Sequence, residues 1–165
     1  MNPRDQYERT ICDCAKCKRP CHAMPGMLIP GDIERIAGYL GHRLEAVLAE
    51  VLASPGALVG TRTPLGIQMG RVPTIVPATR KGRCVFFKED GKCAIHPVAP
   101  YGCGWFDFHM SEAEGDERSK AALRAILTSH SYLEVWIELW LLGRRSPGPE
   151  VKRSKIDALL RVEDN

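Results

Sequence analysis

The hydrophobic pattern first becomes regular between residues 30 and 56. Apolar side chains recur there at the spacing of one helix face, at Ile33, Ile36, Ala37, Leu40, Leu44, Val47, Leu48 and Val51. Gly41 interrupts the pattern and is typical of a helix C-terminus, and Pro55-Gly56 ends the pattern. The sequence therefore predicts two consecutive helices before residue 55.

The pattern then changes to one typical of extended chain. The segment from Ala57 to Lys81 is rich in Gly, Pro and Thr and has short β-branched patches, which predict irregular strands or an extended loop. The next stretch, "RCVFFKEDGKCAIH", predicts a β-hairpin because Asp90-Gly91 is a strong two-residue turn signal. Cys84 would lie on its first strand and Cys93 on its second, and the following loop carries Cys103.

Helical periodicity returns in the last third of the chain. Ser111 followed by Glu114 is a capping-box signature, and the apolar stripe after it ends near Gly143. A short amphipathic helix is predicted from Glu150 to Val162. With no repeat and no linker, the pattern predicts a single α+β domain over residues 1–165. It is mostly α-helical, with a small β-hairpin region and a C-terminal helical region at about 111–162.

Composition adds that this is an ordinary soluble chain. Hydrophobic residues make up 44% and charged residues 26%, the balance of a globular protein. The net charge of +3 is too small to indicate nucleic-acid binding by itself. The polar N-terminus is unlike a signal peptide, and no apolar run approaches the length of a membrane span. We therefore expect a cytoplasmic protein with no membrane partner.

The cysteines say more about the function of the chain than its net charge does. The chain has seven, and in a reducing compartment a crowd of thiols more often binds metal than forms disulfides. A short loop can turn neighbouring thiolates toward one point, and folding can add distant ones. Thiolates are soft ligands that select zinc or iron–sulfur centres. We therefore expect a cysteine-ligated metal centre built from a closely spaced triplet and three later thiols: Cys14, Cys17, Cys21, Cys84, Cys93 and Cys103.

At these residues the chain resembles the YkgJ-type cysteine-cluster family, which is described as chelating zinc or iron. "CAKCKRPCH" is similar to the family pattern CxxCxxxCC, and "GRCVFFKEDGKCAIHPVAPYGCGWFD" is similar to a later family segment. The resemblance covers a core of about 14–107 and implies that the same six cysteines occupy the family's cysteine positions. Ala99 and Gly104 replace two family arginines and His96 replaces a tyrosine, so no role of those residues is carried over.

Four other residues near the thiols have competing interpretations. His22 stands where many family members have a second cysteine, and it could be a further metal ligand, a hydrogen-bond donor to a thiolate or an exposed loop residue. For His96 and His109, a polar loop residue is the favoured interpretation over a ligand. Cys12 lies outside the family spacing, and the Cys-x-Cys step to Cys14 is awkward for one small site, so Cys12 is interpreted as a spare thiol.

The functional hypothesis is a metal-binding protein with a redox or accessory role. Six thiolates exceed the four that one zinc ion or one cubane cluster requires. Either two metals share the six thiolates, or two of the six do not bind the metal directly. The reducing compartment and the iron-linked relatives favour a [4Fe-4S] cluster over Zn²⁺ by a narrow margin. The alternative is a structural zinc site in an interaction module, with a protein partner or, through basic groups such as Arg80-Lys81-Arg83, nucleic acid.

Some enzyme classes are excluded by the motifs. The Cx2Cx3C spacing reverses the Cx3Cx2C of radical-SAM enzymes, and the chain has neither a glycine-rich phosphate loop nor a G-x-S-x-G elbow. Enzymatic activity of another kind is left open.

Overall fold

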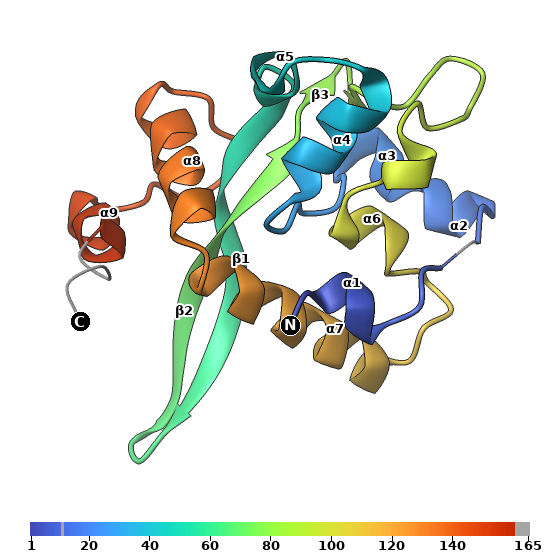
Figure 1. Cartoon of the computed structure of the whole chain (residues 1–165). Coiled ribbons are helices and arrows are strands. Elements are labelled where there is room, and N and C mark those ends of the chain that lie inside the picture. Colours follow the sequence, from blue (N-terminus) through green and yellow to red (C-terminus); the bar gives the residue numbers. More distant parts are fainter. Residues whose placement is uncertain (11, 161–165) are drawn as a thin grey trace.

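The computed structural model describes residues 1–10 and 12–160. The helices are α1 (Pro3–Gln6), α2 (Ala15–Lys18), α3 (Pro20–Ala23), α4 (Asp32–Leu40), α5 (Leu44–Leu48), the 3₁₀ helix η1 (His96–Val98), α6 (Tyr101–Gly104), α7 (Glu112–Leu127), α8 (His130–Leu141) and α9 (Arg153–Leu160). The strands are β1 (Val51–Thr63), β2 (Gly66–Pro77), β3 (Thr79–Arg80) and β4 (Arg83–Cys84). The prediction of a mostly helical α+β fold is confirmed. In Figure 1 the β1–β2 ribbon stands between α8 and α9 on one side and the short helices α2, α3 and α6 on the other.

Strands β1 and β2 form one long antiparallel hairpin. The ladder runs from Val51 opposite Pro77 to the tip at residues 63–66. A bulge after Ser54 accommodates Pro55, which has no N–H to give to the ladder. The sequence predicted only irregular strands or a loop here. The reason is that apolar alternation in the outer half of β2 is limited to Ile67 and Met69, both exposed, before Arg71 interrupts it, so the strand signal there is weak.

The second predicted helix ends earlier than expected, which corrects the sequence analysis. Helix α4 stops at Gly41 in the left-handed conformation (φ 64°), as predicted. Helix α5, however, ends at Leu48, and Val51 already begins β1. The N–H of Ala53 donates to the carbonyl of Arg144 at 2.9 Å, so this segment is paired with chain from the far end of the sequence. Tertiary pairing thus overrides an apolar spacing that also fits a helix.

Helices α7 and α8 supply apolar cover for the hairpin. Ser111 caps α7 by accepting from the Glu114 N–H at 3.2 Å, as the capping box predicted. The predicted helical stripe is divided into two helices because Ser129 caps the second one, α8. Trp136 of α8 is fully buried, and its indole N–H donates to the carbonyl of Ser54 in β1 at 2.8 Å. This part of the protein is therefore a helix packed on a hairpin.

The predicted hairpin around Asp90-Gly91 is reduced to a turn, which is a second correction. The turn itself is present, with the glycine at φ 79°. Its flanks are not paired strands: Phe87 and Cys93 form only an isolated bridge. Cys84 lies in β4, and its backbone is already paired with Thr79 of β3. The two cysteines therefore lie on different local structures instead of on one ribbon.

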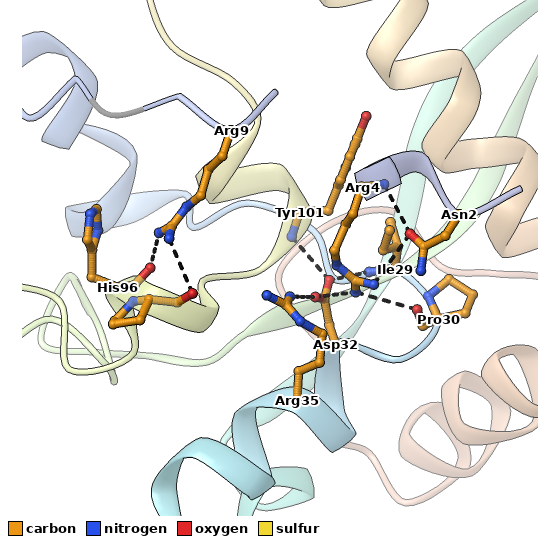
Figure 2. A network of polar contacts seen from close by, with 10 residues as sticks. Asn2, Arg4, Arg9, Ile29, Pro30, Asp32, Arg35, His96 and Tyr101 are labelled. Atoms are coloured by element: carbon orange, nitrogen blue, oxygen red, sulfur yellow. Dashed lines mark hydrogen bonds and ion pairs between the residues drawn. The ribbon is translucent and has the colours of Figure 1, made fainter. Parts of the chain in front are cut away.

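A buried ion-pair network around Asp32 holds the N-terminal segment against α4 (Figure 2). Asp32 is fully buried and accepts from Arg4 and, at 3.0 Å, from Arg35. Its second oxygen accepts from the backbone N–H groups of Ile29 (2.8 Å) and Tyr101 (3.1 Å). A carboxylate can be buried when charged and backbone donors fill its lone pairs in this way. The network joins α1, the first turn of α4 and the first turn of α6.

Candidate metal centre

The structure brings the seven cysteines into two groups. The outer group consists of Cys12, Cys14, Cys17 and His109, whose ligand atoms all lie within 4.8 Å of one another. The inner group consists of four thiols that line one cavity of about 340 Å³, namely Cys21, Cys84, Cys93 and Cys103. The cavity also reaches Cys12 and Cys17, so the two groups are neighbours. Together they contain all six predicted ligands and add two residues for which the sequence favoured other roles.

One stretch of helix carries thiols to both groups. Helices α2 and α3 are joined through Arg19, whose φ of −54° and ψ of −44° keep the chain helical. Cys17 and Cys21 are therefore four residues apart along nearly continuous helix, a spacing that places side chains on one face. Cys17 belongs to the outer group and Cys21 to the inner group. The x3 spacer of the motif thus connects the two groups.

A close contact between two glycines brings Cys103 into the inner group. A Cβ on Gly102 would lie 2.3 Å from the nitrogen of Met27, and a Cβ on Gly26 would lie 2.1 Å from the carbonyl carbon of Gly102. Only glycine fits at both positions. The Gly102 N–H donates to the carbonyl of Met27 at 2.9 Å, and the Gly26 N–H donates to the Cys103 sulfur at 3.2 Å. The segment after α3 is therefore held against α6 beside the Cys103 thiol.

Burial governs the protonation of the inner thiols. Burial, and then the neighbouring thiols of Cys93 and Cys21, raise the pKa of Cys84 to about 11. Burial also raises the pKa of Cys21, of Cys93 and, most strongly, of Cys103. Neighbouring inner thiols further raise the pKa of Cys84, Cys93 and Cys103, which agrees with the place of these residues around one cavity. These groups are thus neutral thiols at pH 7, and metal binding must release their protons.

Cationic side chains line the same cavity: Arg9, Lys18 and Lys92. The guanidinium of Arg9 is held in place by the backbone carbonyls of His96 and, at 3.2 Å, Pro97 (Figure 2). Its charge lowers the pKa of Cys93 against the larger effect of burial. A fixed cation beside a set of thiolates offsets their negative charge. Arg9 was not predicted as a site residue, because an isolated arginine before the first cysteine gives no signal of its own.

Cys14 and His109 make a close contact in the outer group. The Cys14 sulfur lies 3.4 Å from His109 Nε2. The backbone amide of Cys17 and then the His109 side chain lower the pKa of Cys14 to about 6, so this group is largely a thiolate at neutral pH. The backbone amide of Phe108 lowers the pKa of Cys17, but burial and the sulfurs of Cys12 and Cys14 outweigh it and raise that pKa to about 11.

The histidines near the thiols lie in different environments. His109, which the sequence favoured as a polar loop residue, lies in the outer group, and its place shortly after Cys103 is the signal that could have found it. His22 is exposed, and its ring contacts Phe87 edge-on at 5.0 Å between centroids. Metal ligation by His22 stays a prediction. His96 is exposed and lies at the cavity that the inner thiols line.

Comparison with known proteins places the chain in a family. Residues 13–124 match the CxxCxxCC family, described as a "putative zinc- or iron-chelating domain", and the chain belongs to that family. The matched range contains every member of the two groups except Cys12. No curated protein and no solved structure matches the chain. The family and the group of three cysteines and one histidine together support metal binding. Within residues 1–10 and 12–160, none of the helices has the length and apolar character needed to cross a membrane.

Proposed function

We propose that this chain is a metal-binding protein whose cysteines hold an iron–sulfur cluster or zinc, with [4Fe-4S] preferred over Zn²⁺. Cys21, Cys84, Cys93 and Cys103 are the ligands in the inner cavity, and Cys14 and Cys17 bind metal beside it. A bound iron–sulfur cluster supplies one-electron redox chemistry. The role proposed is therefore that of a redox or accessory protein.

The inner group carries this proposal. Its four thiols come from four places along the chain and surround one cavity of about 340 Å³. Four thiolates are what one tetrahedral zinc ion or one cubane cluster requires, so the donor set fits both. A cavity needs only about 10–15 Å³ of such volume to hold one water molecule, so this cavity has room for more than a single ion. That room supports the choice of a cluster.

The wall of the cavity supports the same choice. Phe86, Phe87 and Ile95 line it, and two of them, Phe86 and Ile95, are buried. An apolar shell limits solvent access to a metal centre and so protects an oxidation-sensitive cluster. The cations Arg9 and Lys18 on the same wall offset the charge of four thiolates. A cluster would thus meet both an apolar and a positively charged surface.

A closed zinc site in an interaction module is the second candidate, because four thiolates are equally a structural zinc set. For such a module a protein partner is better supported than nucleic acid. In the basic group Arg80-Lys81-Arg83, Arg80 is already paired with Glu50 at 3.1 Å. Exposed pairs of this kind reduce the positive charge that is free to meet phosphates.

The test is metal and sulfide analysis, with an absorption spectrum, of the chain purified without oxygen. We expect about four iron and four sulfide per chain and a broad visible absorption band. Cys84→Ser and Cys103→Ser should each lose the iron and the colour. Cys12→Ser is the matched control and should keep both, because Cys12 is not one of the four inner ligands.

Two results would change the proposal. A colourless, fully loaded protein whose zinc is lost in Cys84→Ser and Cys103→Ser would replace the cluster by zinc and leave the cysteine assignment intact. A chain that holds neither metal after anaerobic reconstitution, or that loses no metal in either variant, would overturn the proposal.

A further inference from the structure

We infer that the outer group is a second metal site, separate from the inner one, in which Cys12, Cys14, Cys17 and His109 bind one zinc ion. This inference extends the proposed function, in which Cys14 and Cys17 bind metal beside the inner cavity, by assigning them a separate centre and its metal. It also gives a ligand role to Cys12 and His109, which lie outside the six-cysteine pattern.

The distances in the outer group suit a tetrahedral site. Zinc bonds of about 2.3 Å to sulfur and about 2.0 Å to nitrogen separate two sulfur ligands by about 3.8 Å, and a sulfur from a nitrogen by about 3.5 Å. Cys14 Sγ and His109 Nε2 are 3.4 Å apart, and all four ligand atoms fit within 4.8 Å. Side-chain rotations that move the ligand atoms by about an ångström therefore complete the tetrahedron. Three cysteines and one histidine are a standard ligand set for zinc.

Two segments that are far apart in the sequence are hydrogen-bonded to each other close to this site. The hydroxyl of Thr10 donates to the carbonyl of Phe106 at 3.3 Å. Cys12 closely follows the first of these residues and His109 the second, so the contact limits how far apart the two ligands can move. The N–H of His109 donates to Asp107 Oδ1 at 2.8 Å, which fixes the turn that carries the imidazole. The site is thus partly organised by the fold itself.

The outer group differs from the inner one in exposure. Cys12 and His109 of the outer group are exposed, and Cys14 and Cys17 are half-buried. In the inner group Cys84 is buried and the other three thiols are half-buried, so none of the four is exposed. Cys12 and Cys17 also line the inner cavity, whereas Cys14 and His109 do not. An exposed site does not shield an iron–sulfur cluster from water, and a mixed sulfur and imidazole set suits zinc. Zinc is therefore the metal assigned to the outer group.

Zinc analysis of full-length variants, purified without oxygen and exchanged into buffer with added Zn²⁺, tests the inference. Cys12→Ser and His109→Ala each change an exposed residue, and we expect each to lose about one zinc ion per chain while keeping the metal of the inner group. His109→Cys supplies a fourth thiolate and should keep the zinc. Cys103→Ser should do the converse, losing the inner metal and keeping the outer zinc. His42→Ala, at an exposed histidine after α4, is the control and should match the unchanged chain.

Unchanged zinc content in both Cys12→Ser and His109→Ala would overturn the inference. So would loss of the inner metal in these two variants to the extent seen in Cys103→Ser, because a single shared centre would then account for every result. Failure of the proposed function looks different. In that case the chain holds zinc that depends on His109 but no metal that depends on Cys103, and the outer site stands alone.

Discussion

Two regions of the protein differ in how far the apolar core holds them. The helix–hairpin half, made of β1, β2 and α8, lies in that core through Val51, Ile75 and Trp136. The cysteine half, made of residues 12–26 and 84–109, reaches the core only through its second segment, at residues such as Ile95 and Tyr101, and its helices α2, α3 and α6 have only four residues each. Helices of that length do not form on their own, because the cost of nucleation exceeds what a single turn recovers.

This difference indicates where metal binding matters for stability. Neither α2 nor α3 has a buried residue, so apolar packing does little to hold the helical stretch that carries Cys17 and Cys21. The inner thiols meet from four places along the chain, and a metal bound to all of them would tie those places together. The helix–hairpin half does not need a bound metal, because its apolar core holds it together. The predictions below test this contrast, from the largest expected effect to the smallest.

Removal of the metal should loosen one half and spare the other. A metal site that does not exist in the unfolded chain contributes its binding energy to folding, on the order of 10 kcal/mol for structural zinc. We expect a chelated sample to lose hydrogen-exchange protection in residues 12–26 and 84–104, while α8 keeps its protection. Exchange measured by mass spectrometry on loaded and chelated protein checks this. An unchanged melting temperature together with unchanged exchange near Cys17 would show that the cysteine half folds without metal.

The converse change is Trp136→Ala in the helix–hairpin half. Trp136 is fully buried, its ring stacks on Trp140 at 5.1 Å between centroids, and it donates to Ser54. Truncation of such a residue costs about 3–5 kcal/mol of the free energy of unfolding. We expect that loss in urea titration, with metal content per folded chain unchanged. Leu142→Ala, at a side chain that is 68% exposed, should leave stability within error. Loss of metal in Trp136→Ala would mean that the two halves are not energetically separate.

Local signals predicted the parts of the fold that local interactions determine. The end of α4 at Gly41 and the cap of α7 at Ser111 follow from the conformation and hydrogen bonds of a few adjacent residues. The β1–β2 hairpin was predicted poorly because the apolar alternation in its exposed outer half is limited to Ile67 and Met69. The start of β1 at Val51 depends on pairing with chain far along the sequence, which a window of neighbouring residues does not contain.

The same distinction between local signals and long-range contacts applies to the candidate site. Spacing alone identified six cysteines that the structure gathers at two adjacent groups. The assignment of each thiol to a group was not predictable, because it depends on Arg19 continuing the helix and on Thr10 contacting Phe106, residues 96 positions apart in the chain. The interpretation of Cys12 as a spare thiol stays a prediction that the zinc analysis of Cys12→Ser decides.

The smallest of the expected effects concerns the glycine contact inside the cysteine half. In Gly102→Ala the new methyl group would lie 2.3 Å from the backbone nitrogen of Met27, and backbone cannot rotate away as a side chain can. Overpacking of this kind costs about 1–3 kcal/mol and should push Cys103 away from the inner thiols, so metal content should fall along with the melting temperature. Gly38→Ala is the matched control. Gly38 lies inside α4 with nothing within 4 Å of a new Cβ, so alanine there should stabilise the chain by about 0.5–1 kcal/mol and leave the metal in place. Equal behaviour of the two variants would show that the contact between Gly26 and Gly102 does not position Cys103.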